Sequence, residues 1–177
     1  KNEVSISSEL LLIASDRYPE LLLDFYQATL KTKAQNWEIS NVIASHPKIP
    51  FETRKKMLMK GIASRNADHR HYALHKLWDI DQPAAEEILL RLLKKVPKTT
   101  KTEYWLDRNA GLTILVSQSK SPAIWKSTHD LLHRADLGMR MELISNLRPP
   151  EEAPREILFS FFQVFDRYAY DKTLRDE

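Results

Sequence analysis

The stretch Arg70-His71-Tyr72-Ala73-Leu74-His75-Lys76-Leu77 decides how this chain is expected to fold. Its pattern is an arginine, a small or apolar residue three positions later, and a leucine seven positions after the arginine. The pattern returns in residues 108–115 and 140–147, so the three arginines are 38 and 32 residues apart, and a poorer copy begins at Arg54. A period of about 30–45 residues with two helices in each repeat is typical of a helical solenoid.

Helical periodicity extends over nearly the whole chain. Apolar residues recur every three or four positions, as at Leu22, Phe25, Tyr26 and Leu30. Convincing apolar–polar alternation is missing, and so are the Asn-Gly and Asp-Gly pairs that are typical of hairpins. We therefore expect an all-α protein of about ten short antiparallel helices, over residues 6–15, 18–31, 35–45, 51–64, 67–79, 83–96, 102–118, 121–134, 137–147 and 152–169.

An acidic residue precedes each of the three repeat arginines. The pairs are Asp68/Arg70, Asp107/Arg108 and Asp136/Arg140. On these positions, over about residues 35–169, the chain resembles the HEAT and armadillo superfamily of helical repeats, whose second helices commonly open with Asp and then Arg. The resemblance implies a right-handed α-α superhelix and a structural role for these residues, each arginine being tied to an aspartate. Residues 43–50 are also similar to the connection of the variant leucine-rich repeats, another right-handed helical solenoid.

Length and composition set further bounds. A chain of 177 residues is expected to form one domain over residues 1–177 and to bury a core without disulfides or metals. The chain begins with Lys1 and carries no apolar signal core, so we expect a cytoplasmic module of a longer protein. No uncharged apolar run approaches the roughly 20 residues of a membrane helix, so we expect no membrane partner.

The sequence carries no catalytic signature. The absence of cysteine excludes a thiol nucleophile and any zinc site with cysteine ligands. Three glycines leave no glycine-rich phosphate loop, and no G-x-S-x-G elbow exists. The carboxylate pairs Glu86/Glu87 and Glu151/Glu152 fall in expected first helical turns, where the helix dipole favours negative charge. We therefore expect no enzymatic activity and no cofactor.

Two histidine pairs have the spacing of helical metal ligands. His71/His75 and His129/His133 each lie four residues apart, so each pair shares one face of its helix. The apolar positions Leu74 and Leu77 place the first pair on the flank of its helix, which is typical of packed or exposed histidines. We expect no metal site there, and we expect zinc to leave the melting temperature unchanged.

Positive charge is concentrated in the middle of the chain. Residues 27–148 carry a net charge of +9, whereas residues 1–26 and 149–177 carry −3 each. Two basic clusters stand out, Arg54, Lys55, Lys56 and Lys60, and Arg91, Lys94, Lys95, Lys98 and Lys101. In a solenoid, equivalent loops line one edge, so the clusters can merge into a phosphate-binding stripe. The same pattern is typical of a solvated basic face.

The sequence favours a non-catalytic interaction module that binds a protein or peptide, because a solenoid offers an extended surface without a deep pocket. The alternative is a nucleic-acid-binding HEAT-like protein that uses the central basic residues, and a repair enzyme is one form of this alternative. The alkylpurine DNA glycosylases are similar in holding DNA against a basic face with Trp, Asp and Arg, residue types found here at Trp105, Asp107 and Arg108. A compact bundle without true repeats is a third interpretation.

Overall fold

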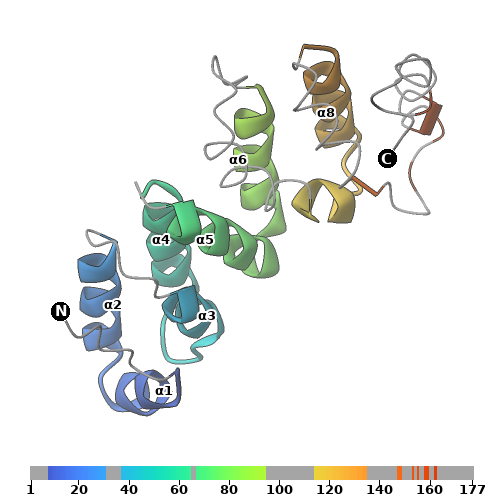
Figure 1. The fold of residues 1–177 in the computed structure, drawn as a ribbon. Helices are drawn as coiled ribbons and strands as arrows, with labels where there is room; N and C mark the ends of the chain where they lie inside the picture. The colour runs from blue at the N-terminus through green and yellow to red at the C-terminus, as the bar shows by residue number, and fades with distance from the viewer. Residues whose placement is uncertain are drawn as a thin grey trace. The chain divides into compact units, whose positions relative to one another are not determined.

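The computed structural model describes residues 8–30, 37–64, 67–94, 114–134, 147–148, 153, 155, 158–159 and 162. Every regular element in these ranges is helical (Figure 1). The chain forms two compact units, residues 1–85 and 86–177. Two units of one solenoid and two separate domains both fit this division, so the expected single domain stays a prediction.

Seven helices have defined bounds. They are α1 (Ser8–Arg17), α2 (Pro19–Thr29), α3 (Trp37–Ser45), α4 (Phe51–Ile62), α5 (Ala67–Ile80), α6 (Gln82–Lys94) and α8 (Pro122–Arg134). Each agrees with an expected range to within two residues at both ends. Residues 114–118 are helical as well, as are 155, 158–159 and 162. The all-α class is therefore confirmed, whereas the expected helix over 137–147 lies outside the described residues except for Leu147.

Proline and aspartate define where two of the helices begin. Pro19 occupies the first turn of α2, where its missing N–H leaves no hydrogen bond unmade. The Asp81 carboxylate accepts a hydrogen bond from the Ala84 backbone N–H at 3.2 Å, so Asp81 caps α6. A single residue, Asp81, thus separates α5 from α6 and turns the chain.

The core of the first unit lies between α2, α3 and α4. Its buried members are Leu22, Tyr26, Ile39, Val42, Ile43, Ile49 and Met57, with Leu23, Phe25 and Leu30 packed against them. The stripe expected in residues 22–30 therefore faces this core. Among the described helices of this unit, the extensive contacts join helices no more than two places apart in the chain, such as α1 with α3 and α3 with α5.

Gly61 on α4 lies against a side chain of α2 and a side chain of α5. A Cβ at this position would fall well inside van der Waals contact with the Tyr26 hydroxyl of α2, and would lie 2.7 Å from the Ala73 Cβ of α5. Tyr26 and Ala73 are themselves fully buried. The missing side chain of Gly61 therefore permits α2 and α5 to pack against the same turn of α4.

In the second unit, Ser119 joins α6 to α8 through its hydrogen bonds. Its hydroxyl donates to Glu86 Oε1 at 3.1 Å and accepts the Ser121 backbone N–H at 3.0 Å. Its carbonyl accepts the Trp125 indole N–H at 2.8 Å. Ser119 is fully buried, so these bonds satisfy its polar atoms and fix α8 relative to Glu86 on α6.

We expect Gly61→Ala to lower the free energy of unfolding by about 1–3 kcal/mol, because the added methyl overpacks the contact between α2, α4 and α5. This loss should appear although alanine gains roughly 1 kcal/mol over glycine in a helix. Chemical denaturation of the purified protein measures it. Lys56→Ala on the exposed side of α4 serves as the control and should change the free energy little.

The double variant Gly61→Ala/Tyr26→Phe separates this contact from a general effect of the methyl group. Removal of the Tyr26 hydroxyl takes away the atom nearest to the new Cβ, so part of the stability should return. Equal losses from Gly61→Ala in the Tyr26 and Phe backgrounds would contradict the packing described here.

Candidate functional site

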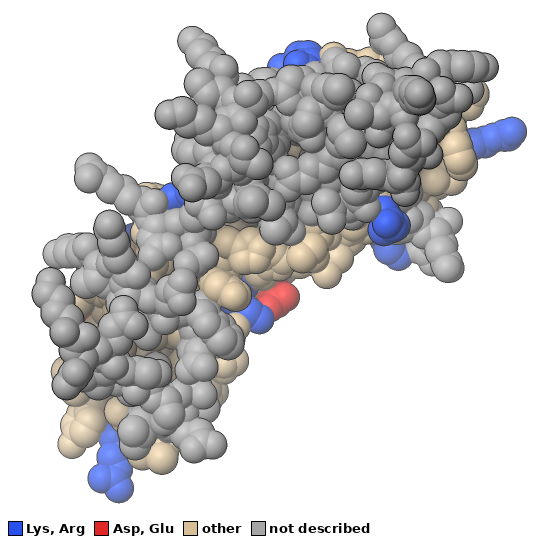
Figure 2. All heavy atoms as spheres, viewed as in Figure 1, with Lys and Arg blue, Asp and Glu red and all other residues tan. Residues whose placement is uncertain are grey.

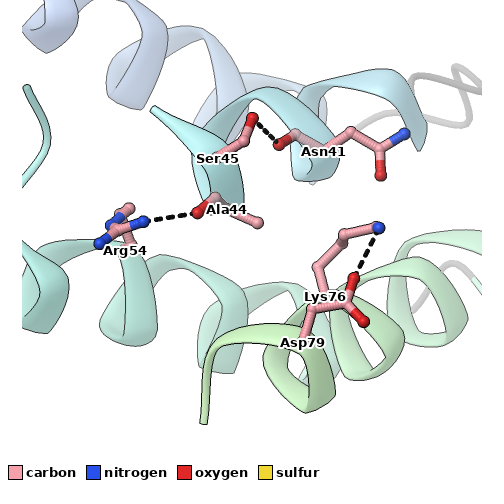
Figure 3. Close-up of polar contacts among 6 residues, drawn as sticks. All are labelled: Asn41, Ala44, Ser45, Arg54, Lys76 and Asp79. Carbon is pink, nitrogen blue, oxygen red and sulfur yellow. Dashed lines mark hydrogen bonds and ion pairs between the residues drawn. The ribbon is translucent and has the colours of Figure 1, made fainter. Parts of the chain in front are cut away.

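Two of the arginines singled out by the repeat pattern bind backbone carbonyls. Arg54 Nη1 on α4 donates to the Ala44 carbonyl at the end of α3 at 2.6 Å (Figure 3). Arg70 Nη1 on α5 donates to the Ser64 carbonyl at 3.0 Å. Each arginine therefore satisfies a carbonyl near the end of the preceding helix, where no intrahelical donor is available. Both arginines thus have a structural contact.

Lys55 is also engaged inside the first unit. Its Nζ lies 2.7 Å from Asp81 Oδ2, and 15% of the Asp81 side chain is exposed. The hydrogen bond from Lys55 is the main cause that lowers the pKa of Asp81, and the bond from the Ala84 N–H lowers that pKa further. Lys55 thus links α4 to the cap of α6, and its charge is largely neutralised.

Lys56 and Lys60 remain on the outer side of α4. Both are exposed, and they lie one helical turn apart. Lys60 Nζ donates to the Gln27 side chain on α2 at 3.2 Å. Met59, with 38% of its surface exposed, lies on the same face. We call Lys56, Met59 and Lys60 the α4 face, in which a partly exposed apolar side chain lies beside two cations.

The second basic cluster is described only in part. Arg91 Nη2 lies 3.3 Å from Glu87 Oε1 one turn earlier on α6, and both side chains are exposed. Surface pairs of this kind contribute little to stability. Lys94 is exposed, whereas Lys95, Lys98 and Lys101 lie outside the described residues.

Some of the basic side chains have partners within the fold. Figure 2 shows one of the drawn Lys and Arg side chains against an acidic side chain. Of the four members of the first cluster, Arg54 and Lys55 have internal partners. The binding role expected for the two clusters therefore stays a prediction that rests on Lys56, Lys60, Arg91 and Lys94.

Another ion pair, which the sequence analysis does not identify, joins the connection between α3 and α4 to the end of α1. Lys48 Nζ, between α3 and α4, lies 2.6 Å from Asp16 Oδ1 on α1 and also donates to the Asp16 carbonyl at 2.7 Å. The bond from Lys48 lowers the pKa of the Asp16 carboxyl. His46, two residues earlier, is buried and accepts the Lys48 backbone N–H through Nδ1 at 3.3 Å.

Both histidine pairs lie as their spacing predicts, side by side along a helix. The ring centroids of His71 and His75 are 4.5 Å apart, and both residues are half-buried. The Nε2 atoms of His129 and His133 are 2.9 Å apart. No group of three or more His, Cys, Asp or Glu side chains converges on one point in the described part of the chain.

Two of the four tryptophans have described side chains. Trp125 is buried and its indole N–H is used by Ser119, so it belongs to the core. Trp78 on α5 is half-buried. The side chains of Trp37 and Trp105 lie outside the described residues, as do the side chain of Asp68 and the whole of Asp107, Arg108, Asp136 and Arg140.

Other apolar side chains among the described residues of the first unit are exposed on α1, around the start of α2 and at the start of α4. Ile13 on α1, Tyr18 before α2 and Leu21 on α2 are each more than half exposed. Phe51 at the start of α4 is 39% exposed.

Within the ranges that the structure describes, no helix is both long and apolar enough to cross a membrane.

Comparison with known proteins gives no assignment. The chain matches no family model, no curated protein and no solved structure. Its function must therefore be argued from the residues and contacts described above.

The Lys55–Asp81 pair predicts a pH dependence. The pKa of Asp81 is lower in the folded protein than its ordinary value of 3.8, so its contribution to stability is complete above that value and is lost as pH falls through the folded pKa. Asp81→Asn keeps a side-chain cap but loses the charge. The stability difference between wild type and Asp81→Asn, measured by urea denaturation, should be constant above about pH 5 and shrink below about pH 4.

Asp81→Ala separates the cap from the ion pair. It should be less stable than Asp81→Asn by about 1 kcal/mol, because the Ala84 N–H then loses its acceptor. A difference between wild type and Asp81→Asn that does not change with pH would contradict the assigned role of the Asp81 charge.

Proposed function

We propose that this chain is a non-catalytic α-solenoid module of the HEAT type that binds a protein or peptide partner. The observation that supports the solenoid is a recurring sequence separation of 31–34 residues in five long-range polar contacts of the described residues, although Lys55–Asp81 spans 26. In the first unit, the bonds Lys48–Asp16, Lys60–Gln27 and Ser64–Leu30 join residues 32, 33 and 34 positions apart. The second unit shows the same spacing.

In that unit, the bonds Ser119–Glu86 and Arg148–Ser117 span 33 and 31 positions. A nearly constant separation is expected when each residue contacts its counterpart in the next repeat. The starts of α2, α4 and α6, at residues 19, 51 and 82, are spaced by 32 and 31 residues. The spacing of 32 between Arg108 and Arg140 has the same period.

The direction of the helices agrees with this interpretation. Gln27 bonds Lys60 and Leu30 bonds Ser64, so residue numbers rise together along α2 and α4. The two helices therefore run parallel, as equivalent helices of successive repeats do. In a bundle of consecutive antiparallel helices, parallel neighbours two places apart are also found, but a constant period is not required.

The surface available to a partner includes the outer side of α4. The α4 face presents Met59 beside Lys56 and Lys60, which suits a partner segment that carries acidic and apolar side chains together. Nucleic acid is the second candidate, because Lys56 and Lys60 can also contact phosphates. The cytoplasmic location expected from the sequence remains a prediction.

The solenoid predicts a long distance between the ends of the chain. The protein has no cysteine, so Ile13→Cys/Phe159→Cys can be spin-labelled specifically, and both positions are more than 60% exposed. Five helix pairs stacked at about 10 Å per pair place the labels roughly 40 Å apart. Electron–electron double resonance measures this distance, and a narrow distribution under about 20 Å would support the compact bundle instead.

The partner is tested by photo-crosslinking from the α4 face. A benzophenone amino acid at position 59 should give a discrete adduct with one protein in an extract of the native host, and the same probe at exposed Ser45 on α3 serves as the matched control. The adduct from position 59 should weaken in Lys56→Glu/Lys60→Glu, because an acidic partner is then repelled. Equal adducts from both positions would contradict the placement.

Fluorescence anisotropy with duplex DNA and single-stranded RNA separates the two functions. The protein-binding function predicts no tight binding even at low salt. Tight binding that falls steeply with salt, with a salt slope that drops by about one for each of Lys56→Ala and Lys60→Ala, would favour the nucleic-acid function.

A further inference from the structure

The His129/His133 pair on α8 has a geometry that its spacing alone does not specify. The two Nε2 atoms lie 2.9 Å apart, with ring centroids at 4.4 Å and ring planes at 82°. One ring therefore donates its Nε2 proton and the other accepts it. The two nitrogens that could bind a metal are therefore close enough for one ion to contact both, once the rings turn away from their direct N–H···N contact.

Asp130 favours the tautomer in which His129 Nε2 is the acceptor. Asp130 Oδ1 lies 3.9 Å from His129 Nδ1, which is too long for a hydrogen bond but close enough for its charge to favour a proton on Nδ1. His129 Nε2 then carries a lone pair directed at His133.

We propose that His129 and His133 together chelate a late divalent transition metal, copper(II) foremost, through their Nε2 atoms. With metal–nitrogen bonds of about 2.0–2.1 Å, nitrogens 2.9 Å apart subtend an angle of about 90° at the metal. This is the angle between neighbouring ligands in square-planar and octahedral sites, which copper(II) and nickel(II) prefer. Copper(II) also binds nitrogen ligands most tightly among the divalent first-row metals.

The ion replaces the proton that the two rings share. The metal takes the lone pairs of both Nε2 atoms, and the Nε2 proton of His133 passes through solvent to its own Nδ1, so both imidazoles stay neutral. His133 is exposed and 28% of the His129 side chain is exposed, so the ion can enter from solvent. Water molecules complete the coordination, because no group of three or more protein donors converges in the described ranges.

Zinc fits this pair less well. A tetrahedral angle at the same bond length separates the two nitrogens by about 3.3 Å, which is wider than the observed 2.9 Å. Copper(II) and nickel(II) should therefore bind before zinc, and the absence of a zinc effect on melting, expected from the sequence, is compatible with this proposal.

The test is a titration of the full, tag-free protein with copper(II) chloride in a weakly competing buffer, followed by electron paramagnetic resonance. We expect one equivalent to bind with nitrogen ligands. His129→Ala and His133→Ala should each weaken binding more than about tenfold, because a chelate becomes a single imidazole. His71→Ala/His75→Ala removes the other pair of the same spacing and should leave the affinity unchanged.

Two further variants control for structural damage. Asp130→Asn should weaken copper binding without removing a ligand, because the negative charge beside His129 is lost. His129→Ala/Asp130→His puts histidines three apart on one helical face, at positions 130 and 133, and should restore part of the affinity. Absence of stoichiometric binding, retention of full affinity in His129→Ala, or its loss in His71→Ala/His75→Ala would each overturn the proposal.

Discussion

The packing of the first unit depends on the close approach that Gly61 permits between α2, α4 and α5. Tyr26 of α2 reaches Gly61, and the neighbouring bonds Gln27–Lys60 and Leu30–Ser64 continue along the same two helices. A bulky side chain at residue 61 would push α2 away from α4 and lengthen these bonds beyond hydrogen-bonding distance. One small residue therefore sets the spacing on which the lateral register of this unit depends.

Polar side chains at the connections determine which charges remain for binding. A short turn between helices leaves carbonyls and N–H groups without intrahelical partners. Arg54, Asp81 and Ser119 supply those partners, and Lys55 balances Asp81. Ion pairs confined to exposed surface, such as Lys76–Asp79 along α5, make no such link between elements (Figure 3). The number of Lys and Arg residues in the sequence therefore overstates the positive charge available at the surface, because Arg54 and Lys55 have partners within the fold.

The local sequence pattern predicts where the helices lie, but it does not predict which residues far apart in the sequence contact one another. Apolar period and proline position placed seven helices to within two residues, because both act over a single turn. The partner of Lys55 lies 26 residues away, and the sequence alone does not show which acidic residue a lysine contacts. The copy of the repeat that begins at Arg54 has Gly61 where the other copies have leucine, and this departure from the pattern leaves room for Tyr26. His129 and His133 were found by spacing, whereas their 2.9 Å contact needed side-chain rotamers.

A binding surface is best sought among exposed residues that belong neither to the core nor to the connections between helices. In the solenoid proposed above, the inward and lateral faces of each helix would contact neighbouring repeats, in keeping with the described polar bonds that join positions 31–34 apart. The outward face is then the part of a helix whose sequence is least constrained by folding. Lys56 and Met59 on α4, and His133 beside His129 on α8, are exposed or partly exposed in this way. Lys60 is exposed too, but it donates to Gln27 on α2, so this part of the α4 face contributes to the fold as well as being open to a partner.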